Sequence, residues 1–242
     1  MNKSKFRKIY VRRLVIRIII FLIMIGLYIW YPKSYEVTKE FNFFKSFSPL
    51  HIIWIIWMID MILKLCKVPK YWPLGSQKIW GDRFLPDLKE RLTIKHIKED
   101  IENINKTIIY VGIFWIVLCL IIAALYFYKV IGYEIVVIIS GFFYVADVIC
   151  IIGWCPFKTF FMHNKCCTTC RIFNWDHAMM YLHLLIIPGF YTYTLVFMSI
   201  LILVVWEITC ANHPERFFEK TNCALRCQNC KDKLCGKRID EE

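Results

Sequence analysis

Five long, nearly uninterrupted hydrophobic blocks constrain this chain more than any other feature of its sequence. They are residues 14–31, 49–65, 108–128, 135–154 and 178–206. A helix rises about 1.5 Å per residue, so a bilayer core of about 30 Å needs about 20 apolar residues. The first four blocks meet or approach that length, and the fifth exceeds it. We therefore predict an all-α integral membrane protein: a helical bundle of four to six transmembrane or re-entrant helices with a cysteine-rich cytoplasmic part.

The blocks divide the chain into spans and connecting segments. We predict a basic cytoplasmic tail (1–13), a first span (14–31), an outer loop (32–48), a second span (49–65), a cytoplasmic loop (66–107) with an amphipathic helix (86–107), a third span (108–128), an outer turn (129–134), a fourth span (135–154), a Cys-rich loop (155–177), a fifth span or re-entrant hairpin (178–206) and a Cys-rich basic tail (207–242). The amphipathic helix has one apolar stripe, which predicts an extension of the third span or a docking face.

The distribution of lysine and arginine predicts the orientation of the spans, because cytoplasmic loops retain an excess of positive charge. With a cytoplasmic N-terminus, segments 1–13, 66–107 and 155–177 place eighteen Lys and Arg residues inside, against four outside in 32–48 and 129–134. We therefore expect a multi-pass protein of the cell membrane with a cytoplasmic N-terminus. The net charge is +12, and the basic residues responsible for it flank the apolar spans. Topology and the lipid bilayer account for it, so no nucleic-acid partner is predicted.

The path of the fifth block decides where the C-terminal tail lies. Pro188-Gly189 interrupts the block, and such a pair breaks helices and allows a chain to turn. A single tilted, kinked helix would carry the tail outside, whereas a re-entrant hairpin would keep it inside. Length favours the single helix, while the seven basic residues after Trp206 favour the hairpin. We expect the tail to lie inside.

The twelve cysteines are numerous for a chain of 242 residues, and eight of them form two groups. The predicted metal ligands are Cys155, Cys166, Cys167 and Cys170 in the first group, and Cys223, Cys227, Cys230 and Cys235 in the second. Thiolates two to four residues apart can surround one tetrahedral ion without a long loop. Each group can fill a four-thiolate site, with His163 or His177 as a spare ligand, or the groups can share sites if they lie on the same side.

Zinc and an iron–sulfur cluster both fit four thiolates, and the spacing does not separate them. Zinc would staple a tail that lacks a core. An iron–sulfur cluster would make the chain an electron-transfer protein at the cytoplasmic face, with a membrane redox partner or a second copy of itself. The run Cys223-x3-Cys227-x2-Cys230 resembles the radical-SAM cluster motif, but the barrel of that family is not predicted around it. A zinc-stapled membrane scaffold subunit is the non-enzymatic alternative.

Disulfide chemistry is the competing hypothesis. Cys167-Thr-Thr-Cys170 is a C-x-x-C beside a helical bundle, which resembles membrane thiol oxidases of the DsbB and vitamin K epoxide reductase type. The resemblance implies a thiol–disulfide oxidoreductase that uses Cys167 and Cys170 and passes electrons to a quinone. Catalytic residues beyond these two cannot be assigned from the sequence.

Several ionisable residues interrupt the apolar blocks or flank them. Within the blocks they are Arg17, Asp60, Lys64, Asp147 and His183, and beside the fifth block they are Asp176, His177 and Glu207. Intramembrane ionisable groups cost several kcal/mol unless paired or hydrated, so they are candidates for function. We expect Asp60 to pair with Lys64 or Arg17, and Asp176 to be a helix N-cap. His51 and His183 differ in depth, which excludes a bis-histidine haem.

Overall fold

The structure of the protein is a computed structural model that describes residues 5–43, 47–66, 73–80, 83–86, 94–163, 166–230 and 234. This part of the chain is helical and contains no strand, apart from an isolated antiparallel bridge between Pro86 and Asn222. The all-helical class predicted from the apolar blocks is thus confirmed.

Seven α-helices and eight short helical turns make up the described chain. The α-helices are α1 (Lys5–Trp30), α2 (Leu50–Leu65), α3 (Leu74–Trp80), α4 (Ile94–Phe127), α5 (Tyr133–Ile152), α6 (Asp176–Tyr181) and α7 (Phe190–Asn212). The turns are η1 (Pro32–Lys39), η2 (Phe157–Met162), η3 (Cys167–Thr169), η4 (Phe173–Trp175), η5 (Leu182–Ile186), η6 (Pro214–Phe217), η7 (Cys223–Leu225) and η8 (Cys227–Asn229).

Four of these helices are long and apolar enough to cross a membrane. They are the segments Phe6–Trp30, Asn105–Phe127, Tyr133–Ile152 and Phe190–Asn212, and between 11% and 39% of each is buried within the protein. Large apolar side chains such as Leu22, Ile113 and Phe197 are exposed on them, as expected of lipid-facing surfaces. The second predicted span is the 16-residue helix α2, which is about 24 Å long and so shorter than a full crossing.

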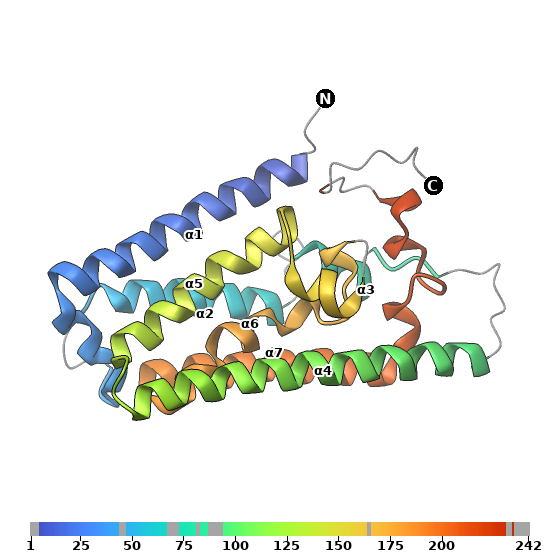
Figure 1. The fold of residues 1–242 in the computed structure, drawn as a ribbon. Helices are drawn as coiled ribbons and strands as arrows, with labels where there is room; N and C mark the ends of the chain where they lie inside the picture. The colour runs from blue at the N-terminus through green and yellow to red at the C-terminus, as the bar shows by residue number, and fades with distance from the viewer. Residues whose placement is uncertain are drawn as a thin grey trace.

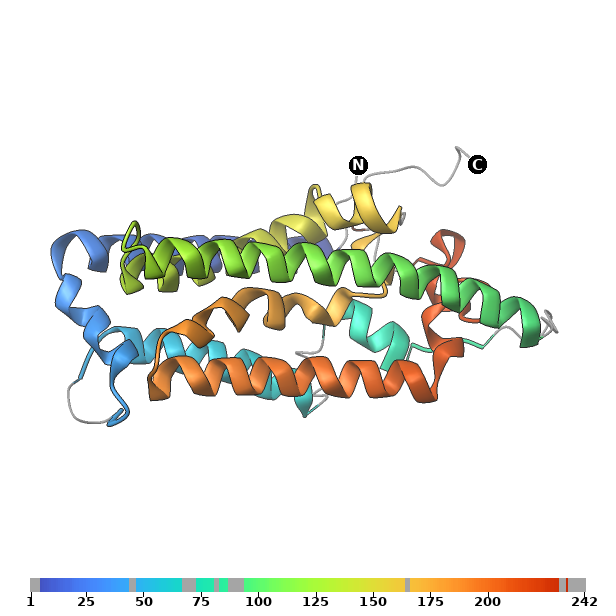
Figure 2. The same cartoon turned by 60° about the horizontal axis from the view of Figure 1, so that its bottom comes forward.

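The long helices run side by side along the axis of an elongated bundle (Figures 1 and 2). α1 packs on α5, while α2 and α6 pack on α7. We call one end of the bundle the cysteine end, because η2, η3, α3 and the segment 214–230 lie there together with the N-terminus (Figure 1). The opposite end holds η1, the turn between α4 and α5, and the first residues of α7.

The fifth hydrophobic block doubles back in the structure. α6, η5 and an extended stretch at Ile187–Gly189 lead from the cysteine end toward the opposite end, and α7 returns (Figure 2). The first leg starts at Asp176, before the apolar block, and uses 3₁₀ and extended backbone, which rise more per residue than an α-helix. This leg therefore covers its distance along the bundle with fewer residues than a continuous α-helix would need.

The segment after α7 folds back on α3 at the cysteine end. Asn222 Nδ2 donates to the Lys78 carbonyl at 3.0 Å, and the Cys223 backbone N–H donates to the Leu85 carbonyl at 2.8 Å. A small core of Ile79, Trp80, Trp206, Phe217 and Leu225 lies beneath these contacts. The described cysteines of both predicted groups are consequently at the same end of the bundle.

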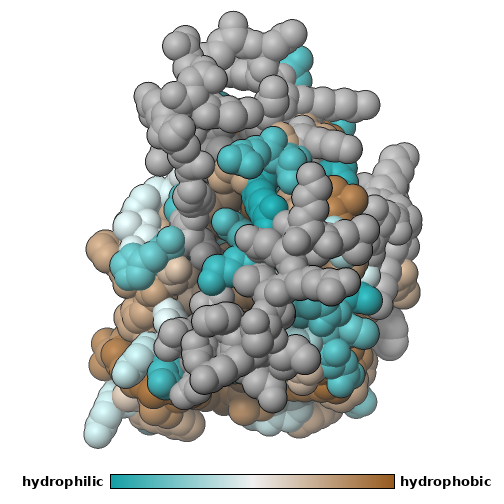
Figure 3. All heavy atoms as spheres, turned by 90° about the vertical axis from the view of Figure 1, so that its right-hand side faces the viewer, coloured by the Kyte–Doolittle hydropathy of each residue, from teal (hydrophilic) through white to brown (hydrophobic). Residues whose placement is uncertain are grey.

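The predicted amphipathic helix belongs to α4, which runs without a break from Ile94 into the third span. Residues 87–93 of that prediction lie outside the described residues. Hydrophilic side chains gather over the cysteine end, with hydrophobic ones around its margin (Figure 3). This end of the bundle therefore presents a hydrophilic face.

Candidate functional site

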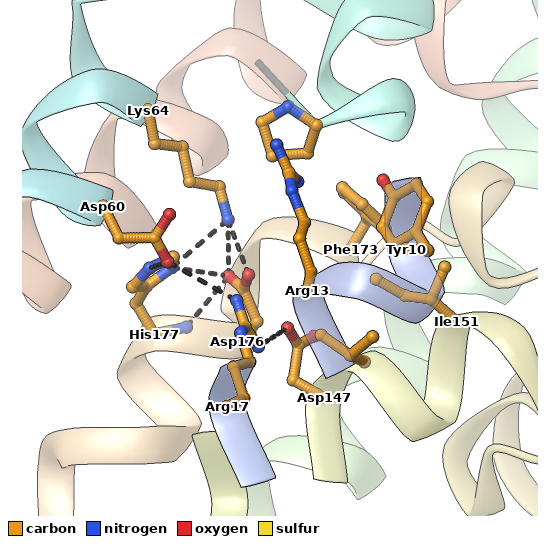
Figure 4. A pocket seen from close by; sticks show the side chains of 12 residues that line it. Tyr10, Arg13, Arg17, Asp60, Lys64, Asp147, Ile151, Phe173, Asp176 and His177 are labelled. Carbon is orange, nitrogen blue, oxygen red and sulfur yellow. Dashed lines mark hydrogen bonds and ion pairs between the residues drawn. The ribbon is translucent and has the colours of Figure 1, made fainter. Parts of the chain in front are cut away.

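Six ionisable side chains meet between α1, α2, α5 and α6 at the cysteine end (Figure 4). They are Arg17, Asp60, Lys64, Asp147, Asp176 and His177, which we call the ionic cluster. All six stood out in the sequence as ionisable groups inside or beside apolar blocks. Their convergence on one place is visible only in the fold, because they come from four segments that are distant in sequence.

Arg17 connects three helices through its guanidinium. Nη1 donates to Asp147 Oδ2 at 2.6 Å and to the Tyr144 carbonyl at 2.7 Å, and Nη2 lies 3.4 Å from Asp60 Oδ2. The guanidinium also lies over the Tyr144 ring, 3.9 Å from its centroid. A charge within an apolar helix is costly unless it is paired, and these contacts provide the pairing.

Lys64 binds Asp176 rather than Asp60. Its Nζ donates to both carboxylate oxygens of Asp176, at 2.6 and 2.7 Å, and Lys64 is almost fully buried. Asp176 is the first residue of α6, while the N-cap is Trp175, so the predicted capping role does not apply. Burial would raise the pKa of Asp176, but the neighbouring His177 and Lys64 outweigh burial and lower it.

His177 lies between the carboxylates of Asp176 and Asp60. Its Nδ1 is 3.1 Å from Asp176 Oδ1 and 3.3 Å from Lys64 Nζ, and its Nε2 is 3.7 Å from Asp60 Oδ2. Within the described chain, Nε2 makes no hydrogen bond although it is buried. Burial opposes a charge on the ring, but Asp176 outweighs it, so the pKa of His177 is raised above the ordinary 6.5.

A proton on His177 would balance the three carboxylates of the cluster against its cations. Three carboxylates (Asp60, Asp147 and Asp176) face two permanent cations (Arg17 and Lys64). Arg13 borders the same space, but its guanidinium is turned toward the Tyr10 ring, 5.5 Å from the centroid. A protonated His177 would supply the third positive charge.

Three thiols converge a short distance from the ionic cluster. Cys150 lies in the last turn of α5, about one turn after Asp147, Cys155 follows the helix, and Cys167 starts η3. The Cys155 sulfur is within hydrogen-bonding range of the Cys150 and Cys167 thiols, and Cys167 Sγ donates to the Cys150 carbonyl at 2.9 Å. Cys150 is not among the eight ligands predicted from the sequence.

The surroundings of Cys155 favour its thiolate. The Cys150 thiol lowers the pKa of Cys155, as does the Cys167 thiol when it donates to Cys155 instead of to the Cys150 carbonyl, and together with the Lys158 and Phe157 backbone N–H groups they outweigh burial. The Lys158 backbone nitrogen lies 3.5 Å from Cys155 Sγ. The same contact with Cys155 raises the pKa of Cys167, as does burial. The result is a Cys155 thiolate that lies beside the thiols of Cys150 and Cys167.

The two C-x-x-C sequences adopt the same turn. In each, a single 3₁₀ turn places the second cysteine N–H on the first cysteine carbonyl, at 3.1 Å for Cys167 and Cys170 and 3.0 Å for Cys227 and Cys230. Such a turn brings two cysteines that are separated by two residues to the same side of a loop.

The eight predicted ligands are distributed unevenly. Cys155 and Cys167 belong to the three-thiol cluster, Cys170 is buried beside it, and the thiol of Cys166 contacts Thr168 Oγ1 at 3.2 Å. Cys223, Cys227 and Cys230 lie in the segment docked on α3, and Cys235 lies outside the described residues. Among the described side chains, no group of three or more histidines, cysteines or carboxylates is already arranged to hold a metal ion. Of the two histidines considered as spare ligands, His177 lies in the ionic cluster.

A further, partly buried ion pair fixes the cysteine loop (155–175) to α7. Arg171 forms a two-fold contact with Glu207 at 2.9 and 2.5 Å, and Trp175 Nε1 donates to Glu207 Oε1 at 2.7 Å. Trp206 Nε1 donates to the Arg171 carbonyl at 2.8 Å. The sequence offered Glu207 only as a residue after the fifth block, without its partner Arg171.

No protein-family model, curated protein or solved structure matches this chain.

Proposed function

We propose that the protein is a membrane-bound thiolate metalloprotein whose cysteine end holds a thiophilic metal, as a zinc ion or an iron–sulfur cluster. The first site uses Cys155, Cys167 and Cys170 together with Cys150, a ligand added by the fold. The second uses Cys223, Cys227, Cys230 and Cys235. If the metal is iron–sulfur, the protein passes electrons to a membrane partner, and if it is zinc, the metal holds the two loops on the bundle.

The convergence of Cys150, Cys155 and Cys167 is the observation that carries this proposal. A disulfide uses two sulfurs, so a third thiol at the same point exceeds what a disulfide requires. Thiolate metal sites take three or four sulfurs, and each must be deprotonated. The lowered pKa of Cys155 and the backbone N–H groups directed at its sulfur favour that state. An ion would draw Cys170 toward the other three side chains.

The common location of the two cysteine groups gives further support. A shared or paired arrangement of sites requires both groups on one side of the bilayer, and both lie at the cysteine end. That end carries the basic N-terminal segment, so the charge rule favours the cytoplasm for it. Thiols in a reducing compartment remain available to metals.

Metal analysis of the full chain, purified without oxygen, tests the proposal. We expect bound zinc, or iron with sulfide and a broad visible absorption. Cys155→Ala should remove about one metal site. Cys119→Ala is the matched control, because Cys119 lies within the α4 span and belongs to neither group, and it should keep the metal content unchanged. A protein without metal, or equal metal in both variants, would refute the proposal.

Thiol–disulfide exchange is a second candidate, favoured by the Cys155 thiolate beside Cys167. In this reaction Cys155 attacks a disulfide of a substrate, and Cys167 then attacks the mixed disulfide and releases the second substrate thiol. The dithiol is oxidised and the substrate disulfide is reduced, so atoms and electrons balance. This pair replaces the Cys167–Cys170 pair that the sequence suggested.

Trapping separates exchange from metal binding. Under exchange, Cys167→Ala should accumulate a mixed disulfide between Cys155 and a small disulfide such as oxidised glutathione, detectable by mass spectrometry. Under metal binding, the same variant loses metal and accumulates no adduct while metal is bound. An adduct that forms equally on Cys119 would indicate nonspecific oxidation and refute exchange at this site.

A further inference from the structure

A small cavity lies within the ionic cluster (Figure 4). Its volume is about 30 Å³, and its lining includes Arg17, Asp60, Lys64, Asp147 and His177. A buried water needs about 10–15 Å³ of such space and two to four polar partners. The cavity therefore has room for one or two water molecules and enough polar groups to bind them.

His177 is a ring in this cavity whose hydrogen bonding is incomplete. It is 3% exposed, and its Nε2 makes no hydrogen bond to the described chain. The nearest acceptor, Asp60 Oδ2, is 3.7 Å away, which exceeds a hydrogen-bond distance. A buried polar atom left without a partner costs about 1–3 kcal/mol, so a bound water between the two groups would stabilise the site.

We propose that this cavity is a proton-binding site, in which a water molecule joins His177 Nε2 to the Asp60 carboxylate and the imidazole takes up a proton from solvent. The chemistry is a simple protonation, so it needs no oxidant or other reactant. The proposal does not depend on metal or disulfide chemistry at the cysteines.

The other ring nitrogen fits this role. Nδ1 lies near both an acceptor, Asp176 Oδ1, and a donor, Lys64 Nζ. In the neutral ring Nδ1 can accept from Lys64, and in the charged ring it donates to Asp176. Both protonation states thus have a partner at Nδ1, and the state of the ring decides which bond is made.

The charged groups around His177 set the balance between these states. Asp176 on α6 and Asp60 on α2 favour the charged ring, and Lys64 on α2 opposes it. Arg17 on α1 is bound to Asp147 on α5, so these two largely compensate each other, and Arg13 is turned to Tyr10. Without a proton on His177, the three carboxylates exceed the paired cations by one charge.

Nitrogen NMR on the full chain in lipid nanodiscs, with ¹⁵N-labelled histidine, tests the proposal. His177→Gln identifies the His177 signals by their loss. We expect both ring nitrogens of His177 to be protonated at pH 6.5, with a titration midpoint above that value. Asp60→Asn should lower the midpoint. Asp147→Asn is the matched control and should lower it less, because Arg17 compensates the Asp147 charge.

A water-contact measurement on the unaltered protein keeps the test independent of the variants. Magnetisation transferred from water should reach His177 Nε2–H faster than it reaches the buried backbone N–H groups of α5. A midpoint at or below 6.5, or an unchanged midpoint in Asp60→Asn, would overturn proton binding. A His177 ring that receives no magnetisation from water would overturn the bound water.

Discussion

Two buried histidines at opposite ends of the bundle have very different surroundings. At the opposite end, His51 Nε2 contacts the Phe43 carbonyl at 2.7 Å, Nδ1 contacts Ser48, and the rings of Phe43 and Phe47 pack on either side. At the cysteine end, His177 lies among carboxylates and leaves Nε2 without a hydrogen bond in the described chain. Burial alone therefore does not identify a functional histidine, and the partners of the ring do.

The same contrast extends to the two ends as a whole. The opposite end is held by close packing of neutral groups: Tyr35 donates to the Met24 carbonyl, and Gly189 lies against Thr38. The cysteine end is held by buried charges on four helices. Buried ion pairs contribute little net stability but are costly to break. We therefore expect charge substitutions to act most strongly at the cysteine end and steric substitutions at the opposite end.

Lys64→Met should have the largest effect. It removes a buried cation bound to both oxygens of Asp176 and leaves the three carboxylates with Arg17 and His177 as their neighbouring cations. Breaking one partner of a buried pair costs about 3–5 kcal/mol. The thermal unfolding temperature in detergent, followed by size-exclusion chromatography of the heated protein, measures the loss.

Lys39→Met is the matched control for this substitution at the opposite end. Lys39 is exposed, and its Nζ lies 3.5 Å from the centroid of the Tyr133 ring. An exposed cation–π contact contributes about 0.5–1 kcal/mol. Equal losses in the two variants would show that the ionic cluster is no more important for stability than a surface contact.

Gly189→Ala tests the packing of the opposite end. A Cβ on Gly189 would overlap the carbonyl oxygen of Thr38, which is backbone and cannot rotate away. Overpacking of this kind costs about 1–3 kcal/mol. Gly112→Ala, where a Cβ would meet the Trp175 ring at ordinary contact distances of 3.7 and 3.8 Å, should change the unfolding temperature little. If both glycines tolerate alanine, the turn between η5 and α7 is looser than the structure indicates.

The sequence predicted the helical membrane class because length and apolarity alone decide it. The first, third and fourth blocks form the membrane-length helices α1, α4 and α5, and the last block forms most of α7. The second block forms the shorter helix α2. The first leg of the last block was harder to predict. It begins at the polar pair Asp176-His177 and continues as a 3₁₀ turn, so neither apolar length nor helical periodicity marks it.

The candidate site was predictable in its members and in one pair, Arg17 with Asp60, but not in its other pairs. Ionisable residues in apolar blocks are conspicuous, so Arg17, Asp60 and Asp147 were identified. The partner of Lys64 was missed, because Asp176 is 112 residues away and only the packing of α6 on the bundle brings it near. The three-thiol cluster was missed for the same reason: short spacings suggested Cys167 with Cys170, and the fold brings Cys150 and Cys155 to Cys167.

The smallest expected effect is a change in the pH dependence of stability caused by His177→Gln. Because the folded protein raises the pKa of His177, the proton stabilises the fold fully below the ordinary pKa of 6.5, and that contribution is lost as pH rises through the folded pKa. The unfolding temperature of the variant should therefore lie furthest below that of the unaltered protein at acid pH, and the difference should shrink toward alkaline pH. Scans from about pH 5.5 to about pH 9 cover the range in which histidine titrates. Lys39→Met gives the reference curve for a substitution at the opposite end. Parallel curves for the unaltered protein and His177→Gln would mean that His177 resembles His51 in being a packing residue, and the contrast between the two ends would then rest on Lys64 and Arg17 alone.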